Sequence, residues 1–410
     1  MSSRREVRFL DRSTPPHIIT LVLMAGVAAM NMSVFLPSLP SMTTYFDTDY
    51  GVMQLSVSLY LAATAALQLI IGPLSDRYGR RPIVLLFIAI FILATLGCLL
   101  SPNIETFLGF RMLQGSVAVG LVLSRAIVRD MVPQNEAASM IGYVTMGMSL
   151  VPMIAPMIGG ALDQLFNWQA TFIFLILAGA GIFTLCFLDQ GETASGEGKS
   201  FAAQVRDYPE LLASRRFWGY VFSAAFASGA FFAFLGGAPL VASEVYGLSA
   251  FWAGFGFGAP AIGYATGNFV SGRFSTAVGI NKMIQTGALI TASFMVLALA
   301  ISLSGYGSAL SFFGLCTFVG VGNGLVMPNA SAGMLSVRPH LAGTASGLGS
   351  AILIGGGAAL SAFAGVALSW GSTDIPLLII MAISACLGYV CILFVVAREK
   401  RLAAMGNLPD

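Results

Sequence analysis

The chain has 410 residues, of which 57% are hydrophobic and 9% are charged, and its formal net charge is +2. Soluble proteins carry about 25% charged residues, so this composition excludes a water-soluble enzyme, and the high apolar content excludes an intrinsically disordered chain. The composition predicts an all-α membrane protein that crosses the bilayer many times.

Twelve apolar stretches are long enough to cross about 30 Å of hydrocarbon as helices. The first six lie at 17–39, 50–71, 82–101, 106–128, 137–161 and 168–188. The second six lie at 217–240, 250–271, 283–303, 308–335, 341–366 and 376–396. Continuous apolar runs are typical of helices, whereas the strands of a membrane β-barrel alternate between apolar and polar residues. We therefore expect twelve transmembrane helices.

The longest polar stretch divides these spans six and six. We expect an N-terminal half at 1–188, a cytoplasmic linker at 189–216 and a C-terminal half at 217–410. The halves also repeat three small residues at a constant spacing of 200, namely Gly72, Ser75 and Gly79 against Gly272, Ser275 and Gly279. Duplicated halves around a central cavity are the general architecture of secondary transporters.

The positive charges predict the orientation of the chain. Lys and Arg occur before the first span and after the even-numbered spans, and the gaps after the odd-numbered spans contain neither residue. Because cytoplasmic loops carry the excess of Lys and Arg, both termini are expected in the cytoplasm.

Two arginines, Arg111 and Arg125, lie inside the fourth span. An unpaired charge in hydrocarbon costs several kcal/mol, and arginine does not lose its proton there, so each must face the protein interior or a watery cavity. On a regular helix the two lie about 21 Å apart and about 40° from a common face, so both can line one cavity. Arg125 is close to the cytoplasmic end, and simple snorkelling also explains it.

Several polar side chains inside the spans can orient a substrate: Asn31, Ser33, Tyr60, Gln68, Gln114, Tyr264, Asn268 and Asn323. Each of them can equally be a hydrogen bond that packs two helices. No acidic residue lies deep in a span. A cavity with arginines and without carboxylates favours anionic, zwitterionic or neutral polar substrates over lipophilic cations.

Six motifs run through the chain in order: FLPSLP at 35–40, GPLSDRYGRRP at 72–82, RMLQG at 111–115, SRAIVRD at 124–130, APMIGG at 155–160 and AGTASGLGS at 342–350. Together they resemble the major facilitator superfamily, and within it the bicyclomycin/chloramphenicol-resistance branch of the twelve-span drug:proton antiporters. The resemblance implies a monomeric efflux transporter of a bacterial inner membrane, which moves small molecules by alternating access and is coupled to protons.

The resemblance also implies conformational roles for particular residues. Asp76 would meet the N-terminal end of the eleventh span, and Arg80 would pair with Asp130, so that the halves are latched in the outward-open state. Pro152, Pro156, Gly159 and Gly160 would bend the fifth span and seal the cavity against leak.

One departure leaves the coupling ion open. The related antiporters commonly carry an acidic residue in the first span, where this chain has Ser33 with Asn31 nearby. A rim carboxylate (Glu244, Asp163 or Glu105) can carry the proton, the substrate can carry it, or the protein is a proton-independent facilitator or exchanger of organic anions or metabolites. The spans contain no catalytic constellation, so we do not expect an enzyme, and we expect no cofactor, metal or nucleic-acid partner.

Overall fold

The computed structural model describes residues 7–132, 140–141, 144, 148, 151–194, 209–338, 341–368 and 373–404. These residues form helices and no strand. Ten of the helical segments are long and apolar enough to cross a membrane. The expected all-α membrane fold is therefore confirmed.

The helices before residue 194 follow the predicted spans, with two interruptions. They are α1 (Ile18–Ser33), η1 (Leu36–Ser38), α2 (Leu39–Tyr45), α3 (Tyr50–Tyr78), α4 (Arg80–Leu99), α5 (Ile104–Leu113), η2 (Gln114–Ala118), α6 (Val119–Met131), α8 (Val151–Leu165) and α9 (Trp168–Asp189). Pro37 and Pro40 lie where the first span gives way to the 3₁₀ turn η1 and the short helix α2, because proline cannot donate the backbone hydrogen bond that a continuous helix needs. In the fourth span the α-helix changes to the 3₁₀ turn η2 at Gln114, three residues after Arg111.

The helices after residue 209 are longer and more regular. They are α11 (Arg215–Leu240), the π-helical turn η3 (Val241–Val245), α12 (Ala250–Val278), α13 (Ile280–Leu303), α14 (Ala309–Val337), α15 (Ala342–Leu368) and α16 (Ile375–Ala404). The last helix continues eight residues beyond the predicted end at residue 396, and its final turns carry the basic residues that the sequence places in the cytoplasm.

The segment that we expected to be a loop at 72–82 is mostly helical. Residues 72–78 form the last turns of α3, and the chain turns only at Gly79, where φ is +98°. The repeated segment behaves in the same way, since α12 ends at Val278 and Gly279 has a φ of +92°. Glycine is needed at both positions because a side chain disfavours this backbone conformation. The spacing of 200 seen in the sequence is therefore also a repeat of backbone structure.

Two of the twelve predicted spans are not among the ten helical segments that are long and apolar enough to cross a membrane. The predicted span at 250–271 is the 29-residue helix α12, whose many glycines lower its mean hydropathy. The predicted span at 137–161 is described mainly over α8, which has 15 residues, and much of its first part lies outside the described residues. Both are helical where the structure describes them.

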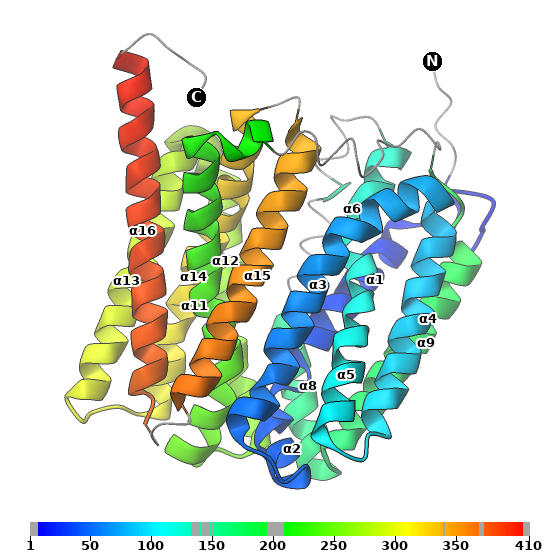
Figure 1. The fold of residues 1–410 in the computed structure, drawn as a ribbon, viewed down its shortest axis with the longest axis horizontal. Helices are drawn as coiled ribbons and strands as arrows, with labels where there is room; N and C mark the ends of the chain where they lie inside the picture. Colours follow the sequence, from blue (N-terminus) through cyan, green and yellow to red (C-terminus); the bar gives the residue numbers. More distant parts are fainter. Residues whose placement is uncertain are drawn as a thin grey trace.

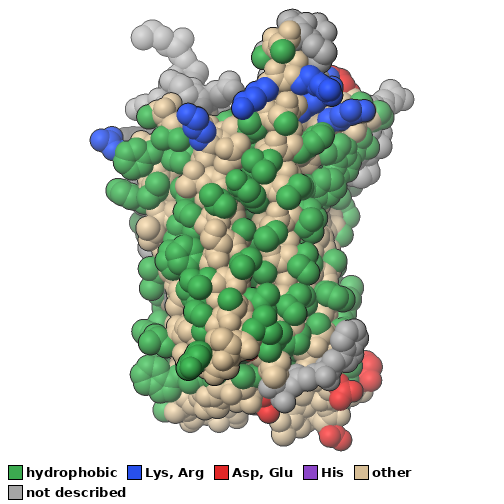
Figure 2. Space-filling model, turned by 90° about the vertical axis from the view of Figure 1, so that its left-hand side faces the viewer, with side chains coloured by type: hydrophobic (Ala, Val, Ile, Leu, Met, Phe, Trp, Pro, Cys, Tyr) green, Lys and Arg blue, Asp and Glu red, His purple; other side chains and the backbone are tan. Residues whose placement is uncertain are grey.

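The helices form two groups that lie side by side (Figure 1). The groups meet where α3 packs on α15 and where α8 packs on α12. Both ends of the chain lie on the same face of the molecule (Figure 1). On the side shown in Figure 2, the basic side chains gather at that face, the opposite face shows acidic side chains and no basic ones, and apolar side chains lie between them.

Candidate functional site

Arg111 is the centre of a buried polar knot in the N-terminal half. Its side chain has no exposed surface. Nε donates to the Ser56 carbonyl oxygen at 3.1 Å, and Nη2 donates to the Asn31 carbonyl oxygen at 3.0 Å. Nη1 donates to Asn31 Oδ1 at 3.0 Å and to Gln114 Oε1 at 2.5 Å. One guanidinium group thus joins α1, α3 and the fourth span.

Two aromatic rings complete the surroundings of this cation. Arg111 Cζ lies 4.1 Å from the ring centroid of Phe35 and 4.3 Å from that of Tyr60. A ring face attracts a cation most strongly where water is excluded. The described residues place no carboxylate against Arg111, so amide oxygens, backbone carbonyls and π faces replace the counter-ion.

The knot contains polar atoms that its protein neighbours leave unsatisfied. Asn31 Nδ2 and Ser56 Oγ are buried and have no hydrogen-bond partner among the described residues. Gln114 Nε2, in contrast, donates to Thr95 Oγ1 at 2.8 Å. Buried polar atoms normally have a partner, so these two atoms keep the capacity to bond a further polar group such as a water molecule.

Arg125 has a different environment, although it lies on the same span. Its side chain is exposed, and it has no hydrogen bond or ion pair among the described residues. It lies within electrostatic reach of Tyr264 on α12, so it faces the other half of the molecule. The structure therefore does not bring Arg111 and Arg125 together, and the expectation that both line one cavity stays a prediction.

The remaining residues predicted to bind substrate differ in how far they are buried. Asn31, Ser33, Tyr60 and Gln114 are buried around or near Arg111, and Ser33 Oγ donates to the Ala29 carbonyl oxygen. Gln68, Tyr264 and Asn268 are half-buried, and Asn268 Nδ2 donates to the Tyr264 carbonyl oxygen at 2.8 Å. Buried Asn323 has an unpartnered Oδ1. Of these residues, Gln68, Tyr264 and Asn268 have the access that a ligand contact requires, because their side chains are partly exposed.

Two hydrogen bonds close the seam between the halves on the face opposite the termini. Tyr50 Oη donates to the Gly236 carbonyl oxygen at 2.8 Å, and Gln54 Nε2 donates to Ser361 Oγ at 2.7 Å. Both donors lie in the first turns of α3, and sequence reasoning missed them because a polar residue near a helix end has no distinctive pattern.

The predicted kinked helix α8 lies against the same seam. A Cβ atom on Gly160 would lie 2.2 Å from the Ala250 carbonyl oxygen, and one on Gly159 would lie 1.6 Å from the Val34 carbonyl oxygen. Pro156 lies inside the helix, and its carbonyl oxygen faces Gly254 of α12. Pro152 is also helical. The small residues of this motif therefore permit backbone contact across the two halves.

The charged residues of the predicted latch contact one another within the N-terminal half, and the expected contact of Asp76 with the eleventh span stays a prediction. Arg80 forms ion pairs with Asp76, one turn earlier, and with Asp130, whose Oδ2 is 2.8 Å from Nε. Glu192, which the sequence places in the linker, accepts hydrogen bonds from the backbone N–H groups of Arg80 at 2.8 Å and Arg81 at 3.2 Å. The carboxylate of Glu192 thus caps the N-terminal end of α4, a contact that carries no sequence signature.

Two buried carboxylates were also missed. Asp189 has no exposed surface and accepts hydrogen bonds from Leu10 N, His17 N and Thr20 Oγ1 at 2.6, 2.8 and 2.6 Å. Asp374 is 5% exposed and accepts hydrogen bonds from Tyr246 Oη and Ser302 Oγ. Because both residues lie at helix ends, the sequence suggested that their carboxylates are exposed to solvent. Each of them joins segments within one half.

Of the three predicted rim carboxylates, Asp163 has the most restricted environment. Ser41 Oγ donates to its Oδ1 at 3.0 Å. Burial raises the pKa of the Asp163 carboxyl above its ordinary value, and the hydrogen bond from Ser41 partly opposes that rise. Glu105 and Glu244 are exposed.

Comparison with known proteins places this arrangement in a family. A sequence profile of the Major Facilitator Superfamily matches residues 21–362. The chain is 31% identical over 375 residues to an uncharacterized MFS-type transporter, YdgK, of Bacillus subtilis, covering 90% of this chain and 92% of that protein. It is 27% identical over 398 residues to a bicyclomycin resistance protein homolog of Haemophilus influenzae, covering 95% and 98%. The crystal structure of a D-xylose–proton symporter superposes with a TM-score of 0.70 at 14% identity, covering 92% and 96%.

Proposed function

Because the chain belongs to the major facilitator superfamily and has relatives among its bicyclomycin-resistance proteins, we propose that it exports small organic compounds by alternating access. The proposed substrates carry an anionic, zwitterionic or neutral polar group. The proposed location is a bacterial inner membrane, where the protein acts as a monomer with both termini in the cytoplasm. The gathering of Lys and Arg at the face that holds the termini (Figure 2) supports this orientation.

The observation that carries the proposal is the state of Arg125. Its side chain is exposed and unpaired among the described residues, and it faces Tyr264 of the opposite half. Meanwhile Tyr50 and Gln54 close the seam at the far face. An exposed cation with an aromatic side chain of the opposite half within electrostatic reach is suited to receive an anionic or strongly polar group.

Arg111 has a different part in this proposal. Four hydrogen bonds and two rings already occupy its guanidinium group. A substrate would have to displace Asn31 or Gln114 to reach it. We therefore assign Arg111 to holding α1, α3 and α5 in register, and we assign the first substrate contact to Arg125.

Proton coupling is the second part of the proposal. Among the rim carboxylates, Asp163 has the raised pKa that brings titration closer to physiological pH, and a coupling group must change its proton affinity between the two open states. Asp163 lies on α8, which packs on α12 across the seam, so separation of the halves would change its hydration. The alternative is a proton-independent facilitator or exchanger, and it is supported by the described surroundings of Arg111, which contain no carboxylate.

Transport by proteoliposomes tests both parts. Bicyclomycin and chloramphenicol are the first compounds to try, because the relatives are named for resistance to them, followed by aromatic carboxylates and quaternary amines of similar size. A proton-coupled exporter should accumulate its substrate against a concentration gradient when a pH gradient is imposed. Uptake that is independent of the pH gradient and follows only the substrate gradient would show that the protein is a facilitator.

A matched pair of variants tests the substrate contact. Arg125→Gln should raise KM for an anionic substrate about tenfold or more, because a hydrogen bond to a charged group contributes roughly 1.5–3 kcal/mol. Arg129→Gln removes an exposed positive charge one turn away on the same helix and should leave KM within about twofold. Equal effects of the two substitutions would reject Arg125 as a substrate contact.

A further inference from the structure

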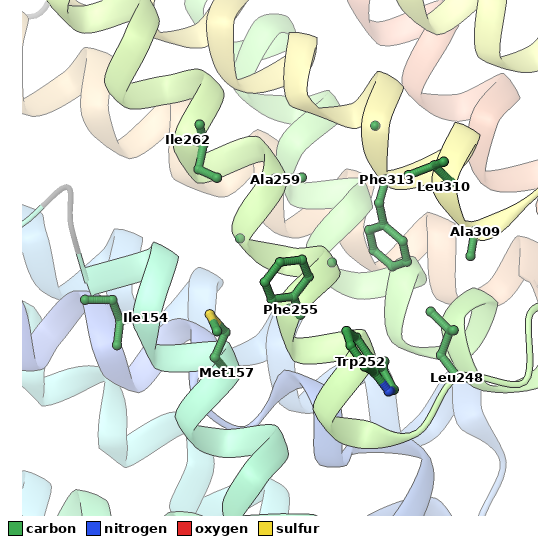
Figure 3. Close-up of a pocket in the computed structure, with 13 residues that line it drawn as sticks. Ile154, Met157, Leu248, Trp252, Phe255, Ala259, Ile262, Ala309, Leu310 and Phe313 are labelled. Atoms are coloured by element: carbon green, nitrogen blue, oxygen red, sulfur yellow. The ribbon is translucent and has the colours of Figure 1, made fainter.

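A groove of about 510 Å³ lies between the two halves, where α8, α12 and α14 meet. Figure 3 shows Ile154 and Met157 on its α8 side, Trp252 and Phe255 on α12, and Leu310 and Phe313 on α14. All the residues that line it are hydrophobic or glycine. None of the residues assigned to substrate binding or to the latch lines this groove.

The groove faces the bilayer. Trp252, Phe255 and Leu310 are 58%, 55% and 84% exposed, although they belong to membrane-spanning segments. Large apolar side chains with this exposure contact lipid in a membrane protein. A concave surface contacts an inserted chain on several sides, and many close atom pairs add up to a substantial dispersion energy.

The length of the groove matches one leaflet. It extends from Leu248 and Ala309, at the ends of the helices opposite the termini, to Ile262. From Ala250, the first residue of α12, to Ile262 the helix rises about 18 Å, and one leaflet contributes about 15 Å of hydrocarbon. An acyl chain of the leaflet opposite the termini therefore fits along the groove.

The charge around the open end of the groove selects the headgroup. Exposed Glu244 precedes the lining residue Leu248 by four positions. The loops at this face, 46–49, 100–103, 166–167, 246–249 and 304–308, contain no Lys or Arg. An ammonium group complements such a rim, whereas a headgroup with a net negative charge is repelled by it.

We propose that this groove is a binding site for one acyl chain of an aminophospholipid, of the phosphatidylethanolamine type, in the leaflet opposite the termini. Beside the groove, the backbones of α8 and α12 touch at Gly160 and Ala250 and at Pro156 and Gly254. The bound chain covers this seam from the lipid side. The site is separate from Arg125 and does not depend on which solute the protein moves.

Quenching of tryptophan fluorescence by brominated lipids tests the site. In a variant that keeps only Trp252, with Trp168, Trp218 and Trp370 changed to Phe, the reporter lies in the groove. The protein is reconstituted with lipids whose acyl chains carry bromine and whose headgroup is phosphatidylethanolamine, phosphatidylcholine or phosphatidylglycerol. Brominated phosphatidylethanolamine should bind about threefold to fivefold more tightly than brominated phosphatidylglycerol, as expected for attraction of about 1 kcal/mol per charge near the surface.

Substitutions that fill the groove provide the control. A Cβ on Gly314 meets no atom within 4 Å, so Gly314→Phe has space to place its ring in the groove, and Ala259→Phe is a second filling variant if the first does not fold. Gly181→Phe adds the same ring at an open position on α9, away from the groove. The filling variants should lose the tight component of quenching, and Gly181→Phe should keep it, with unchanged Tm in each folded variant.

Three results would overturn the proposal. Quenching of Trp252 that is the same in the parent and in a folded filling variant would show that no chain occupies the groove. Equal binding of the three headgroups would reject the aminophospholipid. Displacement of the brominated lipid by a transported compound, at the concentration that half-saturates transport, would assign the groove to the substrate.

Discussion

Two contacts, one in each half of the molecule, hold helices together by different chemistry. In the N-terminal half, the charged side chain of Arg111 joins three helical segments by four hydrogen bonds. In the C-terminal half, α12 and α14 come together where side chains are missing: a Cβ on Gly320 would lie 1.7 Å from the Pro260 carbonyl oxygen, and one on Gly263 would lie 1.9 Å from that of Thr317. The charged group of this half, around Glu399 and Arg216, lies at the ends of the helices.

The difference shows two solutions to the same problem. Apolar surface contributes little to helix association within a membrane, so helices associate through buried polar contacts or through close backbone packing. A polar knot fails when a group is removed, because its partners stay buried and unpaired. A glycine seam fails when a group is added, because the backbones must separate. The contacts of Arg111 and the close packing at Gly263 and Gly320 should therefore be sensitive to opposite kinds of substitution.

The largest effect is expected for Arg111→Met, which keeps the length of the side chain and removes its charge and donors. Asn31, Gln114 and the Ser56 carbonyl would lose their partner, and the cost of breaking such a buried network is about 3–5 kcal/mol. Thermal unfolding and size-exclusion chromatography in detergent measure it. Arg125→Met is the control and should change stability by less than about 0.5 kcal/mol. A stable Arg111→Met protein that has lost only transport would make Arg111 a substrate ligand.

The glycine seam is tested by Gly320→Val. Its side chain would meet the backbone of α12, and overpacking of this kind costs about 1–3 kcal/mol. Gly314→Val is the matched control on the same helix, because a Cβ there meets no atom within 4 Å. A lower Tm for Gly320→Val alone supports the comparison of the halves. Equal Tm values for both variants would show that α12 and α14 can move apart at little cost in stability.

The repeated turns allow a comparison within one experiment. Gly79→Ala and Gly279→Ala both place a side chain at a strongly positive φ, which costs about 1–3 kcal/mol. At Gly79 the new Cβ would also lie 2.5 Å from Glu192 Oε2, whereas at Gly279 it meets nothing. Gly79→Ala should therefore cost about 1 kcal/mol more, the typical contribution of a helix cap.

Glu192→Ala provides the control for these turns. In that background the carboxylate is gone, so Gly79→Ala and Gly279→Ala should have the same effect on the free energy of unfolding. If the difference between them survives, its origin is not the contact with Glu192.

The smallest effect concerns a charge at the edge of the N-terminal half. The pKa of Asp163 is raised by burial, so the folded protein binds this proton more tightly than the unfolded chain. Stability is therefore greatest below the ordinary pKa of 3.8 and falls as pH rises through the raised value. Asp163→Asn should remove this loss and raise Tm at neutral pH by no more than about 2 °C.

The control for Asp163 is Asp49→Asn, an exposed carboxylate at the same face. Its Tm should follow the pH dependence of the parent protein. A Tm for Asp163→Asn below that of the parent at neutral pH would show that the ionised carboxylate stabilises the fold.

Much of the architecture could be predicted because bilayer thickness sets the length of a span. The predicted starts at residues 50, 168 and 250 agree with the helices to the residue. The burial of Arg111 also followed from the cost of a charge in hydrocarbon. The sequence predicted a loop between the spans that end at residue 71 and begin at residue 82, whereas the chain turns only at Gly79. A helix that continues past the hydrocarbon into water loses its apolar pattern, so its last turns were not recognised.

The partners within the site could not be predicted in the same way. Whether Arg111 meets Asn31 and Gln114 depends on the rotation of three helices about their axes, and apolar spans that are hydrophobic on all sides do not encode that rotation. Asp189 was assigned to the linker because a carboxylate after an apolar run normally reaches solvent. Its three donors come from a segment more than 160 residues earlier in the chain.

The two turns at Gly79 and Gly279 have nearly the same backbone, but the residues that follow them differ: Arg80 and Arg81 stand where the second turn has Ile280 and Asn281. The interactions of Arg80 with Asp76 and Asp130 lie near the surface, where salt screens charges over about 8 Å at physiological ionic strength. Salt therefore weakens the ion pairs beside the first turn, and the second turn has no counterpart of Arg80. Two turns with the same backbone thus differ in how strongly salt acts on the contacts beside them.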